Sequence, residues 1–89
     1  MPTKAQIDKV WKLAKPVRGQ DSSQVRQDPY GNRIRKADYG TNKAAGWEID
    51  HIKPAARGGS DATVNLQALK TSVNRGKGDS LVKKSRHSK

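Results

Sequence analysis

The sequence predicts a small α+β fold, made of an N-terminal helix, short strands and a second short helix. Three observations support this prediction: apolar residues repeat at helical spacing within residues 4–14, apolar and polar residues alternate within residues 47–51, and residues 64–69 form a further short apolar segment. Residues 53–62, between the last two, contain proline and paired glycines. We therefore expect a loop there that returns the chain antiparallel.

The size and composition of the chain limit how it can be stabilised. The chain has 89 residues, of which 31% are hydrophobic, so we expect one domain, residues 1–82, followed by a basic tail, residues 83–89. Domains this small often need a metal ion, a partner subunit or tight helix packing. The sequence has no cysteine, which excludes disulfides and thiolate zinc sites. Any metal ion must be bound by Asp, Asn or His.

No apolar segment approaches the roughly 18 residues that a membrane span requires. The N-terminal stretch, with its lysines, also lacks the apolar centre of a signal peptide. We therefore expect a cytoplasmic protein with no membrane association. The oligomeric state stays open between a monomer and a homodimer.

The charge of the chain indicates its kind of partner. Lysine and arginine number 19 against 8 aspartate and glutamate, a formal net charge of +11. A surface tuned only for solubility normally mixes both signs. The excess, which is densest after residue 61, therefore favours a polyanion such as nucleic acid.

The N-terminal helix has recognisable ends. Thr3 and Gln6 have the spacing of a capping box at its start, and Pro16 ends it. We expect Trp11 in the core, with base stacking as the minor alternative.

A small hairpin-like unit is expected next. Residues 17–27 are polar and predict a surface loop, and residues 28–32 have the proline, glycine and asparagine of a turn. Residues 33–36 predict a short strand with Ile34 inward and basic residues outward.

The predicted strand at residues 47–51 ends with Asp50 and His51. Successive strand residues point to opposite faces, so these two side chains diverge unless the strand bends. Pro54 ends this strand.

A short helix is expected after the second strand. Thr71 or Ser72 can cap it, and Gly78 and Asp79 terminate it. From Lys83 onward no apolar periodicity remains, which predicts a disordered basic tail.

Asp50, His51 and Asn74 suit the hydrolysis of a phosphodiester. That reaction needs a metal ion to neutralise charge, a base to deprotonate water and a group that fixes the tautomer of the base. Asp50 offers an anionic oxygen and Asn74 a neutral carbonyl oxygen, which suit a Mg²⁺ shell completed by phosphate and water. His51 can be neutral and basic near pH 7. The structural alternatives are a turn-capping Asp50, a strand-end His51 and an ordinary helical Asn74.

Four segments along residues 46–79 occur in a characteristic order. They are Gly46 to Pro54, Gly58 to Asp61, Asn65 to Gln67 and Asn74 to Asp79. As a set they resemble the HNH endonucleases, whose core is the ββα-metal (His-Me finger) fold. Residues 28–40 also look like the segment that precedes this motif in a common subgroup.

The resemblance implies a role for each matching residue. His51 corresponds to the general base and Asp50 to a metal ligand. Asn65 matches the middle asparagine, which braces the loop and helps to hold the histidine; bracing alone and a direct catalytic role are both retained. Asn74 matches the last motif position, where many members have histidine. Asparagine there favours one Mg²⁺, or Mn²⁺, over Zn²⁺.

The implied function is a metal-dependent endonuclease that nicks or cuts DNA, with double-stranded DNA as the expected partner. Phosphate contacts are expected from Arg57, Lys70, Arg75 and Lys77, each of which could equally be a surface charge. Many family members also carry two Cys-x-x-Cys pairs, so here the N-terminal helix or a second subunit must brace the core. The alternatives are a non-catalytic DNA-binding module on the same fold and an RNase.

Overall fold

The computed structural model describes residues 2–76, so Lys77, the expected helix end at Gly78 and Asp79, and the expected tail lie outside the described residues. Within that range, no helix has the length and apolar character needed to cross a membrane. The helices and strands, in chain order, are α1 (Lys4–Leu13), β1 (Lys15–Pro16), β2 (Val25–Gln27), β3 (Arg33–Arg35), β4 (Trp47–His51), β5 (Leu66–Lys70) and α2 (Thr71–Arg75), with 3-10 turns η1 (Lys36–Asp38), η2 (Ala55–Arg57) and η3 (Thr63–Asn65).

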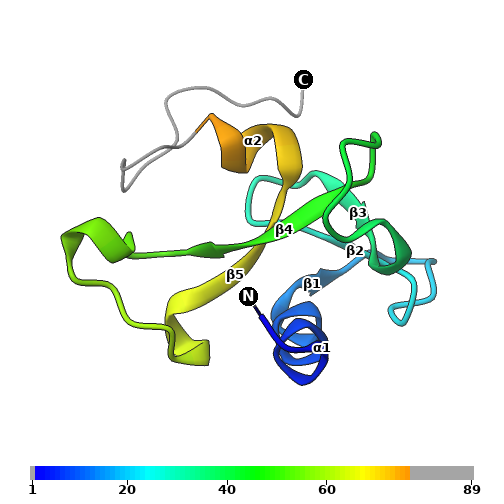
Figure 1. The fold of residues 1–89 in the computed structure, drawn as a ribbon. Helices are drawn as coiled ribbons and strands as arrows, with labels where there is room; N and C mark the ends of the chain where they lie inside the picture. Colours follow the sequence, from blue (N-terminus) through cyan, green and yellow to red (C-terminus); the bar gives the residue numbers. More distant parts are fainter. Residues whose placement is uncertain (1, 77–89) are drawn as a thin grey trace.

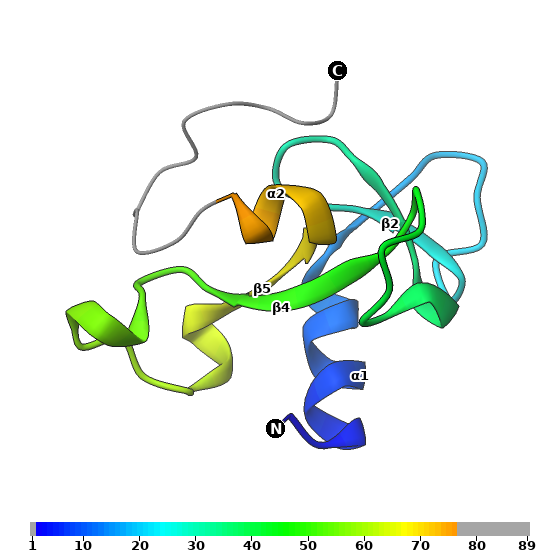
Figure 2. The same ribbon diagram turned by 45° about the horizontal axis from the view of Figure 1, so that its top comes forward.

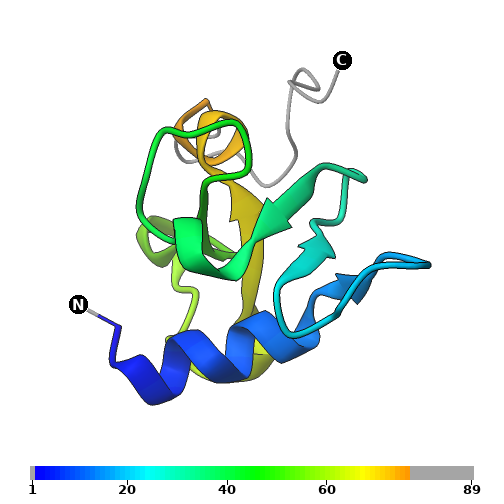
Figure 3. The ribbon, with the colours of Figure 1, turned by 90° about the vertical axis from the view of Figure 1, so that its right-hand side faces the viewer.

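The strands form two antiparallel sheets. β1, β2 and β3 make a three-stranded sheet in that order, and β4 and β5 make a two-stranded hairpin. Helices α1 and α2 lie on opposite sides of the hairpin (Figures 1 and 2). The three-stranded sheet stands beside the hairpin (Figure 3). The predicted α+β class, with helices and antiparallel strands, is confirmed.

The start of α1 follows the prediction in part. The Thr3 hydroxyl accepts the Gln6 backbone N–H at 3.1 Å, and the chain leaves the helix at Ala14 before Pro16. The second half of the capping box is wrong, because the Gln6 side chain donates to the carbonyl oxygen of Asp61 at 3.4 Å. The glutamine therefore links α1 to a distant loop.

The core lies between α1, the hairpin and β3. The rings of Trp11 and Trp47 lie 5.2 Å apart, and Tyr39 meets Trp47 edge-on at 4.9 Å. Trp11 is 2% exposed, as predicted, and Ile34 is completely buried. The expected bracing by the N-terminal helix is thus present. The core cluster consists of Val10, Trp11, Ile34, Trp47, Leu66 and Ala68.

The prediction of a loop over residues 17–27 is wrong at its end. Residues 25–27 form β2, the central strand of the three-stranded sheet. This strand is short and only half buried, so it lacks a clear alternating pattern. β2 forms because it pairs with β1 on one side and with β3 on the other. A loop connects it to β1, and the predicted turn at residues 28–32 connects it to β3.

Asp28 is 2% exposed and organises that turn. Its Oδ1 accepts the backbone N–H groups of Tyr30 and Asn32, both at 2.9 Å. Its Oδ2 accepts the Asn32 side-chain amide at 2.9 Å and the Lys70 backbone N–H at 3.0 Å. One carboxylate therefore ties the turn to the end of the hairpin.

The strand at residues 47–51 has the predicted bounds, and the chain returns antiparallel. The second strand begins at Leu66, because Val64 lies in η3 with 86% of its surface exposed. The predicted cap of α2 is also wrong: its N-cap is Lys70, and the Thr71 hydroxyl donates instead to the carbonyl oxygen of Thr41 at 2.7 Å.

Candidate active site

The β4–β5 hairpin presents different side chains to its two sides. Trp47 and Ile49 of β4 pack into the core with α1. Glu48 and Asp50 alternate with them and lie opposite Leu69 and Gln67 of β5. Because successive strand residues point to opposite faces, Glu48 and Asp50 face α2.

On the α2 side, side-chain hydrogen bonds hold the polar groups in place. Asp50 is 7% exposed, and its Oδ2 accepts the Gln67 side-chain amide at 2.8 Å. Asn74 donates its side-chain N–H to Glu48 Oε1 at 3.1 Å, and Arg75 donates to Glu48 Oε2 at 3.1 Å. Asp50 and Asn74, predicted as metal ligands, therefore lie on the same side of the hairpin, each held by a different partner, and we call Glu48, Asp50, Gln67 and Asn74 together the polar cluster.

His51, the last residue of β4, lies on the other side of the strand, towards α1. Its Nε2 lies 2.7 Å from Oδ1 of Asp61, in the loop between the strands. When the neutral ring donates this hydrogen bond, Nδ1 is its basic nitrogen. One third of the His51 side chain is exposed, and it lines a hollow of about 300 Å³ with Gln6 and Asp61. The ring is accessible from solvent.

Asn65 closes the loop between the strands. Its side-chain oxygen accepts the Lys53 backbone N–H at 2.8 Å, and its amide donates to the carbonyl oxygens of Lys53 at 3.1 Å and Ser60 at 2.7 Å. A side chain at Gly59 would meet the Lys53 carbonyl oxygen at 1.7 Å, so the loop folds tightly against its own start. Asn65 thereby fixes the segment that carries Asp61.

The expected phosphate-binding cations are spread around this hairpin. Arg57 is exposed in η2, Lys70 ends β5, and Arg75 pairs with Glu48 in α2. Lys77 lies outside the described residues. The structure therefore places Arg75 beside the polar cluster and Arg57 at the far loop.

A comparison with protein families covers the segment in which these residues lie. A family model described as HNH endonuclease matches residues 28–82. The chain belongs to the HNH endonuclease family. No curated protein and no solved structure matches the chain with significance. The HNH match includes the hairpin and α2 and leaves α1, β1 and β2 outside it.

HNH nucleases generally use a divalent metal ion, and Asp50 and Asn74 on the α2 side of the hairpin carry oxygen atoms of the kind that such an ion binds. Asp50 supplies a carboxylate, and Asn74 turns its amide nitrogen to Glu48, which directs its carbonyl oxygen away from Glu48. Within residues 2–76, no three His, Asp or Glu side chains form a metal cluster. A small set of oxygen ligands completed by water and phosphate is the usual environment of Mg²⁺.

Two residues of this site were missed from the sequence. Glu48 shares the strand face of Asp50, so the alternating pattern could have identified it as the group that orients Asn74. Asp61 falls within a motif segment, but its contact with His51 spans 10 residues of loop, and no local pattern predicts which side chain such a loop brings back.

Proposed function

We propose that this HNH endonuclease hydrolyses phosphodiester bonds of duplex DNA, using one divalent ion, Mg²⁺ or Mn²⁺, held by Asp50 and Asn74. The observation that carries the proposal is the polar cluster on the α2 side of the hairpin. It lies within the family match and supplies the two oxygen ligands that such an ion prefers. On this proposal β4, β5 and α2 form the ββα-metal core.

His51 is the proposed proton acceptor. It is partly exposed and follows Asp50 directly at the end of β4. Because the two side chains leave opposite sides of the strand, the phosphate has to lie across the strand end to meet both. His51 then takes a proton from the attacking water. The water oxygen bonds to phosphorus as the bond from phosphorus to the 3′ oxygen breaks, and the departing oxygen takes a proton from solvent, which leaves a 5′-phosphate and a 3′-hydroxyl.

The remaining residues hold these groups in position. Gln67 fixes one oxygen of Asp50, and Asn65 fixes the loop that carries Asp61 against His51. When bound, the metal ion supplies positive charge that stabilises the phosphate and the departing oxygen. Arg57, Lys70, Arg75 and Lys77 are the proposed phosphate contacts near the site.

The decisive experiment incubates the protein with supercoiled plasmid in Mg²⁺, in Mn²⁺ and in a chelator. We expect cleavage with either metal and none with the chelator, and the ratio of nicked to linear plasmid reports how many strands are cut. His51→Ala should lower the cleavage rate about 10² to 10⁴-fold, the usual contribution of a general base. His87→Ala is the matched control and should cleave like the unaltered protein.

Each alternative function gives a different result. A non-catalytic binding module would retain plasmid in a gel-shift assay and cut it under no condition. An RNase would degrade a structured RNA faster than plasmid. Unchanged cleavage by His51→Ala would remove His51 from the mechanism while leaving the nuclease assignment in place.

A further inference from the structure

The three-stranded sheet carries a row of polar side chains across its outer side. On β3, Ile34 is fully buried while Arg33 on the same strand is exposed. Lys15 of β1 pairs with Gln27 of β2, and Gln27 pairs with Arg33. Paired residues of antiparallel strands have side chains on the same side of the sheet. Lys15, Gln27 and Arg33 therefore form one row, with a cation at each end.

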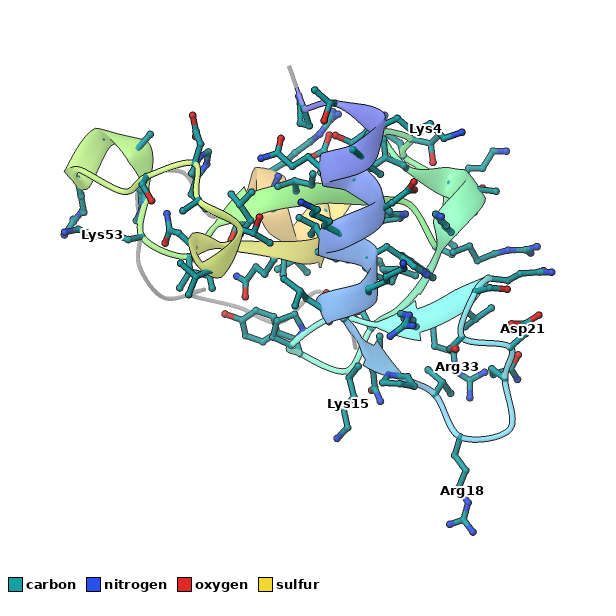
Figure 4. The ribbon with its side chains drawn as sticks, turned by 90° about the horizontal axis from the view of Figure 1, so that it is seen from below. Lys4, Lys15, Arg18, Asp21, Arg33 and Lys53 are labelled. Atoms are coloured by element: carbon teal, nitrogen blue, oxygen red, sulfur yellow. The ribbon has the colours of Figure 1, made fainter. Side chains whose placement is uncertain are left out.

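Arg18 adds a third cation to this region. It lies in the loop between β1 and β2, and Figure 4 shows it pointing away from the body of the molecule, on the opposite side of the view from Lys53. The loop also contains Asp21, whose Oδ1 accepts the backbone N–H and the hydroxyl of Ser23. We call Lys15, Arg18 and Arg33 the sheet cations.

The sheet cations are among the many described cations that have no ion-pair partner in residues 2–76. Within residues 2–76, none of the three forms an ion pair with a carboxylate, whereas Lys36 pairs with Asp8 and Arg75 pairs with Glu48. Their charge is not neutralised by neighbouring acids of the described chain. A concentrated, uncompensated positive charge attracts an external polyanion.

A cleft lies beside this surface and reaches Gln67 of β5, with the acidic residue Asp28 also in its wall. It has a volume of about 470 Å³, and its walls include Lys15 and Gln27 from the three-stranded sheet and Gln67 from β5. Gln67 is the residue that donates to Asp50. The exposed apolar side chains of Leu13 and Ile52 also line the cleft. A chain of phosphates on the sheet cations can thus continue towards Asp50.

We propose that the sheet cations bind the backbone of duplex DNA and guide it along this cleft to the end of β4. The proposal rests on the proposed function, because it takes DNA as the substrate. β1 and the loop after it precede the segment that the HNH family model matches, whereas Arg33 of β3 lies inside it, so this surface extends beyond the matched segment on its N-terminal side. Phosphate contacts of this kind fix the position of the duplex and carry no sequence information.

The test compares two triple variants that remove the same charge. Lys15→Gln/Arg18→Gln/Arg33→Gln removes the sheet cations, and Lys4→Gln/Lys9→Gln/Lys12→Gln removes three exposed cations of α1. Binding to a short duplex is measured in chelator by fluorescence anisotropy over a range of salt concentrations. Each lost phosphate contact lowers the slope of log K against log salt by about 0.9. We expect a loss of about 2.7 for the sheet variant and less than about 1 for the control.

Cleavage assays on the same variants separate positioning from chemistry. The sheet variant should raise KM for plasmid with little change in kcat, because the reacting groups are intact. Equal slopes and equal KM values in the two variants would overturn the proposal, since the effect would then follow total charge. If the unaltered protein neither binds nor cuts duplex DNA, the proposed function itself is wrong, and the role of the sheet cations falls with it.

A second measurement needs no substitution and so does not depend on how the variants fold. Acetylation of lysine amines is followed by mass spectrometry with and without excess duplex, in chelator. Lys15 should be protected by the duplex and Lys12, three residues earlier on α1, should react as before. Protection of Lys12 and Lys15 to the same degree contradicts the proposal.

Discussion

The ten strand residues of the β4–β5 hairpin send side chains to both of its sides, and the two sides differ in composition. Towards α1, the hairpin presents Trp47, Ile49 and Ala68 to an apolar core. Towards α2, it presents Glu48 and Asp50, held by side-chain hydrogen bonds. In this small basic domain, the α1 side therefore supplies much of the apolar packing, and the α2 side carries the two proposed metal ligands. Substitutions on the two sides should separate these properties.

The largest effect on stability is expected on the α1 side. Trp47 is fully buried and contacts both Trp11 and Tyr39. Trp47→Ala should lower the free energy of unfolding by about 3 to 5 kcal/mol, through lost burial and the cavity left behind. Urea unfolding followed by circular dichroism measures it. A loss below about 1 kcal/mol would mean that this side is not the main source of stability.

The matching substitution on the α2 side should leave the stability of the fold nearly unchanged and should lower the affinity for the metal ion. Asp50→Asn keeps an oxygen that can accept the Gln67 hydrogen bond and removes the negative charge. We expect the affinity for Mg²⁺ or Mn²⁺ to fall about 10 to 100-fold, measured by calorimetric titration, with the urea midpoint little changed. Asn74→Ala should also lower the affinity for the ion. Unchanged affinity in both variants would refute the ligand assignment.

Asn65 sits at the end of the hairpin and should affect both properties. Asn65→Ala removes three hydrogen bonds to the loop. We expect a loss of about 1 to 2 kcal/mol in unfolding free energy together with slower plasmid cleavage. Asn65→Asp keeps the acceptor for the Lys53 N–H and loses both donated bonds, so it tests them separately. A stable but slow Asn65→Asp protein would indicate that the donated bonds position the loop.

The smallest effect is a pH dependence confined to the α1 side. Burial, followed by the nearby charge of Glu48, raises the pKa of Tyr39 above its ordinary value of 10.0. The stability that this tyrosine contributes is therefore complete below pH 10 and is lost as the pH rises through the folded-state pKa, because the unfolded chain ionises first. Urea unfolding across this range measures it. Tyr39→Phe should lose that part of the pH dependence, and an identical profile in both proteins would contradict the assignment.

The sequence predicted β4 and its antiparallel partner because alternation over five residues is a strong signal. It placed the start of β5 two residues too early, at Val64. This residue is apolar but exposed, so its hydrophobic character did not indicate a buried strand position. β2 was missed because its three residues are stabilised by pairing with strands on both sides, which a local pattern does not reveal.

The same limit applies to the site. The sequence proposes Asp50, His51, Asn65 and Asn74 as site residues because their order along the chain is characteristic. It does not indicate the partners that orient them, because a hydrogen bond such as that between Asn74 and Glu48 joins residues 26 positions apart.

Asp28 has a consequence for how the two sheets are joined. Its two oxygens accept four N–H groups, one of them from Lys70, 42 positions away at the start of α2. Asparagine at this position has only one such oxygen, and its amide would face N–H donors. The turn is therefore joined directly to Lys70, the N-cap residue of α2, so a displacement of the three-stranded sheet is passed to the start of the helix that carries Asn74.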